Sequence, residues 1–403
     1  MPIIASDFLF HSTVMRGSLR GISTDDLVRD SIHSAPQLVQ LAELTLDFQL
    51  LLDALARSRV QLLFQCRILG GQFLVGLVVL FQLRPHDLYT GDILVQQRFK
   101  FFRLRLTEFL LANGDENLAN YLDAVDTLEP LPDAFFNPLY EKLKMYYVTG
   151  GMPESVLMWT QARDVEAMQE ALSGIIGAYE RDFAKHPNVS EFPKISMIWK
   201  SVPSQLAREN KKFIYKVVKE GARAREYEDA LQWLVDARLV HKVYRSTAPG
   251  LPMSAYDDLS AFKIYLVDVG LLRRLAQLAP TAFGEGNRLF TEFKGALTEN
   301  YVLQTLITQF EVMPRYWSQN NPPYEVDFLI QRENDIFPVE VKAEANTTSR
   351  SLRKFKELFP GQVKLRVRFS LDNLKLDDDV LNIPLFMADQ ADRLIGLALE
   401  KKA

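Results

Sequence analysis

Two carboxylates and a lysine near the C-terminal end of the chain have the spacing that metal-dependent phosphodiester cleavage needs. Asp327 lies in one apolar run, and Glu340 and Lys342 lie at the end of the next. Both runs are rich in β-branched and aromatic residues, and the polar residues 332–335 separate them, so they predict an antiparallel hairpin with a four-residue loop. This loop pairs Asp327 with Glu340. Because side chains alternate faces along a strand, Glu340 and Lys342 are expected about 7 Å apart, on the face that also carries Asp327.

The apolar side chains of the two runs are expected on the opposite face of the hairpin, where they pack inward against a helix. One face is therefore expected to be core and the other to carry the chemistry. The expected core residues are Val326, Phe328, Ile330, Phe337, Val339 and Val341.

The expected chemistry is binding of a hard divalent cation. Asp327 and Glu340 could hold Mg²⁺ or Mn²⁺ and leave positions open for water and a phosphate oxygen, while Lys342 orients the attacking water. Glu299 is the expected third metal ligand, because it stands on the apolar stripe of a predicted helix over 292–310. A carboxylate on such a stripe is costly unless a cation or a donor accompanies it. The alternative is that all four residues form a salt-bridged surface without a metal.

A second candidate site is a basic stripe upstream of the hairpin. Residues 202–245 begin with helical signals and end in a short alternating strand over 239–244, an order that suggests a winged helix. Within this unit six basic side chains are interrupted by Glu220 alone, so they could follow a phosphate backbone. The alternative is a solvated helix face in a bridging domain. The stripe consists of Lys211, Lys212, Lys216, Lys219, Arg223 and Arg225.

Composition narrows the class of protein. With 403 residues, of which 48% are hydrophobic, the chain can bury a large core and is expected to divide into several domains. The net charge of -4 means that any nucleic-acid contact must come from a local basic patch. Cys66 is the single cysteine, which excludes an intramolecular disulfide and fits a cytoplasmic protein. The apolar run 73–81 is far shorter than the roughly 20 residues of a membrane-spanning helix, so no membrane association is expected.

Residues 1–99 differ in composition from the rest of the chain. They contain no lysine and a single glutamate, Glu43. The glycines at 70, 71 and 76 could suggest a phosphate loop, but such a loop needs Lys-Ser or Lys-Thr after its last glycine. No nucleotide-binding residue can therefore be named. One hypothesis is that this segment derives from a truncated gene read upstream in another frame or strand.

From residue 101 onward the sequence predicts a series of amphipathic helices. Between two of them, Gly150 and Gly151 allow a tight turn and Pro153 starts the next helix, so this motif is expected to be a corner. Asp268, after the strand-like run 263–267, is expected to cap a further helix. The first five predicted helices span 106–112, 116–125, 138–147, 152–159 and 164–185.

Several separated strings over about 101–357 carry a family resemblance. In their order and spacing the chain resembles a prokaryotic ATPase family in which an AAA-type domain is fused to a C-terminal domain of unknown function with a restriction-endonuclease-like, or PD-(D/E)xK, core. In that comparison Asp327, Glu340 and Lys342 occupy the nuclease motif positions and Glu299 the helix acid. The strings lie at 106–110, 150–154, 202–206, 212–213, 263–272, 295 with 299–300, 325–328 and 339–342.

The resemblance implies a multi-domain α/β protein. Its expected parts are an atypical segment over 1–99, a helical lid-like domain over 100–198, a winged-helix-like domain over 199–260 and a nuclease-like domain over 261–403. ATP is the cofactor that the family implies, but residues 1–99 carry no motif for it.

Two functions follow from these expectations. The first is a Mg²⁺-dependent DNA phosphodiesterase. The second is an ATP-binding or degenerate regulatory protein that binds nucleic acid or protein without cleavage, and an inactive remnant is a third alternative.

Overall fold

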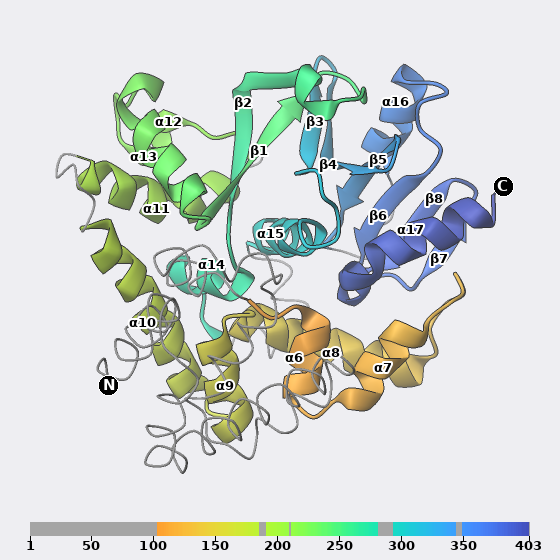
Figure 1. The fold of residues 1–403 in the computed structure, drawn as a ribbon, viewed down its shortest axis with the longest axis horizontal. Coiled ribbons are helices and arrows are strands. Elements are labelled where there is room, and N and C mark those ends of the chain that lie inside the picture. The colour runs from red at the N-terminus through yellow and green to blue at the C-terminus, as the bar shows by residue number, and fades with distance from the viewer. Residues whose placement is uncertain (1–102, 185–190, 209–210, 281–292, 344–348, 403) are drawn as a thin grey trace, which may run out of the picture. The chain divides into compact units, whose positions relative to one another are not determined.

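The computed structural model describes residues 103–184, 191–208, 211–280, 293–343 and 349–402. Their contacts group all of these residues into one compact unit (Figure 1). The predictions for residues 1–99, including the missing phosphate loop, lie outside the described residues. Helices and a mixed β-sheet give this unit an α/β fold, as expected.

Five helices form the first part of the described chain, at the positions that the amphipathic pattern predicts. The largest difference is at α8. The sequence predicted that this helix begins at Pro138, but it begins at Asp133 and contains Pro138 in its interior. Aromatic packing accounts for the extra turn, because Phe135 stacks on Tyr121 with ring centroids 3.7 Å apart. The helices are α6 (Leu106–Ala112), α7 (Glu116–Ala124), α8 (Asp133–Thr149), α9 (Pro153–Ala162) and α10 (Val165–Phe183).

Three further helices lead into a β-hairpin. Helix α11 packs on α13, and the chain then forms the antiparallel strands β1 and β2. The alternating run predicted over 239–244 is β1. The elements are α11 (Phe192–Leu206), α12 (Tyr215–Val218), α13 (Ala224–Asp236), β1 (Val240–Ser246), η3 (Met253–Tyr256) and β2 (Asp257–Leu266).

The C-terminal part completes an eight-stranded sheet, in the order β2-β1-β3-β4-β5-β6-β8-β7. Strands β3, β4 and β5 are antiparallel neighbours, and β6 and β8 continue parallel to β5. The elements are α14 (Val269–Leu275), α15 (Lys294–Leu306), β3 (Arg315–Asn320), β4 (Pro323–Arg332), β5 (Asp335–Val341), α16 (Arg350–Leu358), β6 (Arg366–Ser370), β7 (Lys375–Asp377), β8 (Val380–Pro384), η6 (Leu385–Gln390) and α17 (Ala391–Glu400).

The sheet combines strands from two of the expected domains. Strand β1 pairs in parallel with β3 through Arg245 and Tyr316, so the hairpin belongs to the same sheet as the C-terminal strands. The boundaries expected after residues 198 and 260 fall inside α11 and β2. Strand β2 therefore runs from the residues expected to form the winged helix into those expected to form the nuclease-like region, and the domain boundaries stay a prediction.

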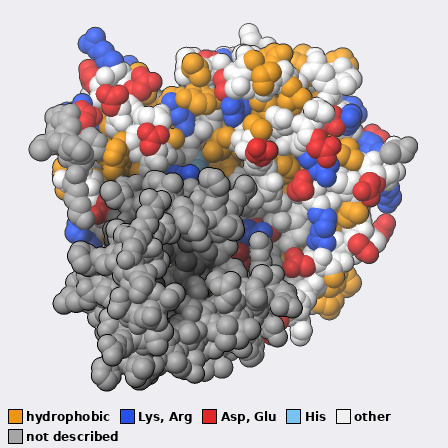
Figure 2. Space-filling model, viewed as in Figure 1, with side chains coloured by type: hydrophobic (Ala, Val, Ile, Leu, Met, Phe, Trp, Pro, Cys, Tyr) orange, Lys and Arg blue, Asp and Glu red, His pale blue; other side chains and the backbone are white. Residues whose placement is uncertain are grey.

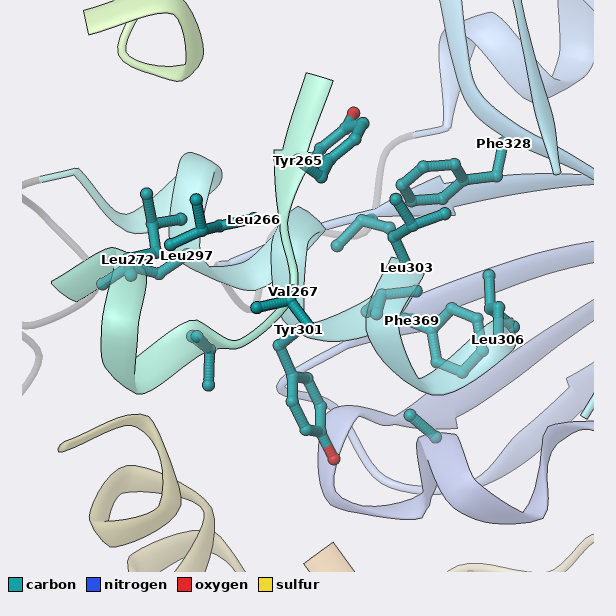
Figure 3. Close-up of a cluster of buried hydrophobic side chains, with 14 of the residues drawn as sticks. Tyr265, Leu266, Val267, Leu272, Leu297, Tyr301, Leu303, Leu306, Phe328 and Phe369 are labelled. Atoms are coloured by element: carbon teal, nitrogen blue, oxygen red, sulfur yellow. The ribbon is translucent and has the colours of Figure 1, made fainter. Parts of the chain in front are cut away.

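Two hydrophobic clusters cover opposite faces of the sheet. The larger cluster contains α15, whose Tyr301 and Leu303 lie with Phe328 and Phe369 of the sheet in Figure 3. The smaller cluster contains Leu352 and Phe355 of α16, and its sheet residues are Trp317, Val326, Leu329 and Ile336. Burial of these side chains from water holds one helix on each face of the sheet.

The hairpin of β4 and β5 has the predicted register but a shorter loop. Phe328 lies opposite Val339, which is the register that pairs positions 327 and 340. The ladder continues to Arg332 and Asp335, so a two-residue turn replaces the predicted four-residue loop. Glu333 in this turn has a φ of 54°, a left-handed conformation that tight hairpin turns use.

An irregularity between β3 and β4 changes the faces of the residues before Phe328. Arg315 pairs with Leu329, but Trp317 pairs with Val326, so two residues of β4 lie opposite one residue of β3. Such a bulge reverses the alternation of side chains beyond it. The expectation that Val326 shares a face with Phe328 is therefore wrong, because Val326 packs with the α16 cluster and Phe328 with the α15 cluster.

The motif around Gly150 is a structural junction. Gly150 ends α8 and Pro153 begins α9, which confirms the predicted corner. Asp268 caps α14 as predicted, by accepting a hydrogen bond from the Leu271 backbone, and it also accepts one of 2.8 Å from the Gly151 N–H. Gly150 has a φ of 70°, and a Cβ there would lie 2.2 Å from Asp268 Oδ1. Two separated strings of the sequence thus meet in one contact that requires glycine.

None of the helices in the described part of the chain is both long enough and apolar enough to cross a membrane.

Candidate functional site

The carboxylate of Asp327 lies at the bulge of β4, on the side of the sheet that α15 covers. Its Oδ2 accepts a hydrogen bond of 2.7 Å from the Val341 N–H of the neighbouring strand. Burial raises the pKa of Asp327 to about 8, and the negative charge of Glu299 on α15 acts in the same direction. The positive charges of Lys263 and Lys211 oppose this shift. Two of the predicted metal ligands, Asp327 and Glu299, are therefore close enough to influence each other.

Glu299 is buried and accompanied by donors, as the apolar stripe of its helix required. It forms an ion pair with Lys211, and the Tyr265 hydroxyl donates a hydrogen bond of 3.1 Å to its other oxygen. Burial alone would raise the pKa of Glu299, but the charges of Lys211 and Lys263 bring it below its usual value. Both oxygens that could bind a metal already have partners in the protein.

Lys263 is a site residue that the sequence analysis did not identify as one. Its side chain is fully buried in β2, forms an ion pair with Glu325 and lies over the Tyr316 ring, with Nζ 4.8 Å from the ring centroid. Burial lowers the pKa of Lys263, but the nearby carboxylates of Glu325, Glu299 and Asp327 outweigh burial and raise it. The available signal was a lysine within the apolar strand 263–267, since a buried lysine needs acidic partners.

We call these five residues the charge network. They are Lys211, Lys263, Glu299, Glu325 and Asp327.

Glu340 and Lys342 form a separate pair. Glu340 Oε1 and Lys342 Nζ are 2.8 Å apart, which confirms that the two side chains lie on the same face. Glu340 alternates with Val339 and Val341, both of which pack in the α15 cluster, so its side chain lies on the face that α16 covers. Its neighbour in β6 is Arg368. Glu340 Oε2 is buried, and none of the described residues donates a hydrogen bond to it.

The expected convergence of the acidic residues on one face is therefore not observed. The bulge places Asp327 with Glu299, whereas Glu340 and Lys342 lie across the sheet. Within the described residues, no three or more aspartate, glutamate, histidine or cysteine side chains are arranged to hold a metal ion. Asp327 and Glu299 influence each other's charge, and Glu340 lies apart from them.

The basic stripe is divided between the interior and the surface. Lys211 points into the charge network and Lys212 is partly buried. Acidic residues on and beside α13 also reach the surface, so this exposed face carries both positive and negative charges. Figure 2 shows basic and acidic side chains intermixed over the visible face of the molecule. The exposed cations are Lys216, Lys219, Arg223 and Arg225, and the exposed acids are Glu220, Glu226, Glu228 and Asp229.

Comparison with known proteins gives two partial matches. Residues 140–282 match the family model of a domain of unknown function, DUF8612, and residues 294–386 match that of another, DUF4143. No curated protein and no solved structure matches the chain. Lys211 and Lys263 belong to the first matched region, and Glu299, Glu325 and Asp327 belong to the second. The charge network therefore joins the two regions.

Proposed function

We propose that this chain is a relative of AAA-type ATPases that binds nucleic acid through its winged-helix-like region, and that its C-terminal nuclease-like region does not cleave the ligand. The observation that carries the proposal is the position of Lys211 and Lys263 against the carboxylates expected to hold a metal. A metal-dependent phosphodiesterase needs such oxygens for its cation, with further positions open for water and phosphate. Two protein cations that already balance these carboxylates favour a binding role.

The order of the elements supports a nuclease-like core. Helix α15 is followed by the antiparallel strands β3, β4 and β5, then by α16 and the parallel strand β6. Asp327 lies on the second of these strands and Glu340 and Lys342 follow on and after the third, which are the motif positions that the family resemblance implies. The upstream order of α11, α12, α13 and the β1–β2 hairpin is the order expected of a winged helix.

The exposed cations beside this hairpin support nucleic acid as the ligand. Lys216 and Lys219 lie on and after α12, and Arg223 and Arg225 lie at the start of α13. All four side chains are exposed, so they can reach phosphate groups without a rearrangement of the core. Phosphate contacts of this kind supply affinity and orientation but carry no sequence information. We therefore expect binding with little preference for sequence.

The test is the affinity of the full chain for a labelled DNA duplex as a function of salt. If all four cations contact phosphates, the slope of log K against log salt is about −3.6 and falls by about 1 for each contact removed. Replacing all four residues with glutamine should therefore abolish most of the salt dependence and weaken binding at low salt. Fluorescence anisotropy measures both quantities.

A matched variant controls for the change in net charge. It replaces four exposed lysines far along the chain, Lys364, Lys375, Lys401 and Lys402, with glutamine. This control should keep the salt slope of the wild type. Equal losses in the two variants, or no binding by the wild type, would rule out the proposed nucleic-acid surface.

Cleavage is a second candidate function, favoured by one observation. Glu340 has a buried carboxylate oxygen that accepts no hydrogen bond from any described residue. Asp327 and Glu299 lie on the opposite face of the sheet. A bound divalent cation would supply charge stabilisation to a phosphodiester. If this candidate is correct, Asp327→Ala abolishes metal-dependent cleavage and leaves DNA binding intact.

ATP remains a family expectation, and its residues cannot be named. A thermal melt with ATP added tests it, because a ligand that binds only the folded state raises the melting temperature.

A further inference from the structure

A group of four aromatic side chains lies where α12 meets the β1–β2 hairpin. The Phe213 ring stacks on the Phe262 ring with centroids 5.3 Å apart, and it meets the Tyr215 ring edge-on at 4.9 Å. Tyr244 meets Phe262 edge-on at 6.1 Å. Rings at these distances form one continuous cluster. We call Phe213, Tyr215, Tyr244 and Phe262 the aromatic platform.

The aromatic platform has a buried base and an accessible surface. Phe213 and Phe262 are buried, and the Phe213 N–H donates a hydrogen bond of 2.8 Å to the Phe262 carbonyl. Tyr215 and Tyr244 are only partly buried. Burial raises the pKa of Tyr215 to about 12, and the negative charges of Glu228 and of the Tyr244 phenolate act in the same direction. The two tyrosine hydroxyl groups are therefore close enough to influence each other.

Lys242 of β1 adds a positive charge to the aromatic platform. Its Nζ lies 4.8 Å from the centroid of the Tyr244 ring and 4.3 Å from that of the Phe262 ring. Contacts of an ammonium group with ring faces hold it in place without neutralising its charge. Within the part of the chain that the structure describes, no carboxylate forms an ion pair with Lys242. Its charge is therefore available to an anionic ligand.

The surroundings of the aromatic platform are apolar and largely basic. Leu259, shortly before Phe262 in β2, is 70% exposed. Helix α12 and strand β1, which carry the two tyrosines, contain no acidic residue and contribute Lys216 and Lys242. The acidic neighbour is Glu228 of α13. Accessible ring surface and nearby cations are the combination that binds the bases and the phosphates of a single strand.

We propose that Tyr215 and Tyr244 stack on bases of a single-stranded nucleic acid while Lys242 contacts its phosphates. In a duplex the faces of each base are covered by the neighbouring base pairs, so a ring on a protein surface can stack only on an unpaired base. Stacking of this kind tolerates any sequence, because every base has a ring face. The inference rests on the proposed function and deepens it, since it names the form of nucleic acid that the winged-helix-like region takes.

The experiment compares the full-length wild type with a double variant, Tyr215→Leu with Tyr244→Leu, which keeps apolar bulk and removes the rings. Fluorescence anisotropy with a labelled oligothymidylate should show an affinity loss of about tenfold for each base that stacks. The slope of log K against log salt should stay the same, since stacking releases no counterions. Affinity for a duplex should also stay the same. Equal oligothymidylate affinities for the two proteins would overturn the proposal.

Tyr140→Leu is the matched control. Tyr140 is a partly buried tyrosine of α8, outside the winged-helix-like region, and Lys144 Nζ lies 4.6 Å from its ring centroid. This variant loses the same kind of ring beside the same kind of cation, and it should bind oligothymidylate like the wild type. Salt-dependent duplex binding without any effect of the double variant would refute the aromatic platform alone. Absence of duplex binding by the wild type would refute the proposed function.

A second measurement uses the wild type alone and does not depend on the folding of a variant. An oligonucleotide with iodouracil in place of thymine forms covalent adducts on illumination with aromatic rings that stack on it, and mass spectrometry locates the modified residues. Adducts should form on Tyr215 or Tyr244. Adducts on neither residue would contradict the proposal.

Discussion

At the scale of single residues, the molecule balances buried acids with lysines. Lys263 contributes most to this balance, because its fully buried ammonium group is close to three carboxylates. The buried Glu299 shows the same logic from the acidic side, since its two oxygens are bound by an ammonium group and a hydroxyl group. Buried charges persist only when they are paired in this way. The residues that looked like metal ligands in the sequence thus have partners within the chain.

Replacement of Lys263 should be strongly destabilising. Lys263→Met leaves Glu325 without its ion-pair partner and Glu299 with one cation fewer, and loss of one partner of a buried pair costs about 3–5 kcal/mol. Urea denaturation, followed by circular dichroism, measures this loss in the free energy of unfolding. Lys364→Met, at a position that is 60% exposed, should change it by less than about 0.5 kcal/mol. Similar midpoints for the two variants would mean that the network does not stabilise the fold.

Asp327 should make stability depend on pH. Its pKa is about 8 in the folded chain and 3.8 without the shift, so between these values the folded state binds more protons than the unfolded state. Stability therefore falls as the pH rises from about 4 to about 8. The Asp327→Asn side chain is neutral and can still accept the Val341 hydrogen bond. The difference in unfolding free energy between this variant and the wild type should therefore shift in favour of the variant when the pH is raised from 5 to 8. Parallel denaturation curves for both proteins across this range would contradict the assigned shift.

At the scale of elements, the sequence allowed most of the local structure to be predicted and little of the pairing between distant strands. The register of β4 with β5 followed from alternation and a short polar gap, and the cap at Asp268 followed from its place after an apolar strand. The bulge could not be predicted, because it depends on β3, which the sequence analysis did not identify as the neighbour of β4. That one inserted residue separates Asp327 from Glu340.

The junction of α8 with α14 gives a prediction for Gly150. Gly150→Ala introduces a Cβ that would meet Asp268 Oδ1 at 2.2 Å, at a residue whose φ of 70° already disfavours a side chain. Backbone strain alone costs about 1–3 kcal/mol, so we expect a larger loss in the free energy of unfolding. Gly114→Ala separates the two causes, because Gly114 has a φ of 79° and nothing lies within 4 Å of its added Cβ. If both variants lose the same stability, close packing against Asp268 has no effect.

At the scale of the whole described unit, one sheet and one charge network connect the regions matched by two separate family models. Strands β2 and β1 come from the first region and β3 to β8 from the second, with β8 ending at Pro384. Lys211 and Lys263 cross the same boundary to reach Glu299 and Glu325. The sequence could not reveal this composite site, since its members lie up to 116 positions apart and only their side-chain types were visible. The cations of one region thus form ion pairs with carboxylates of the other.

The central claim is that this chain binds nucleic acid while its own lysines take the place of a catalytic metal. The most direct measurement follows one labelled duplex with the full chain in EDTA, in Mg²⁺ and in Mn²⁺, and records anisotropy and strand length in the same samples. The account predicts saturable binding in EDTA and an intact duplex under all three conditions. Cleavage in Mn²⁺ or Mg²⁺ that Asp327→Ala abolishes, or binding that EDTA eliminates, would contradict it.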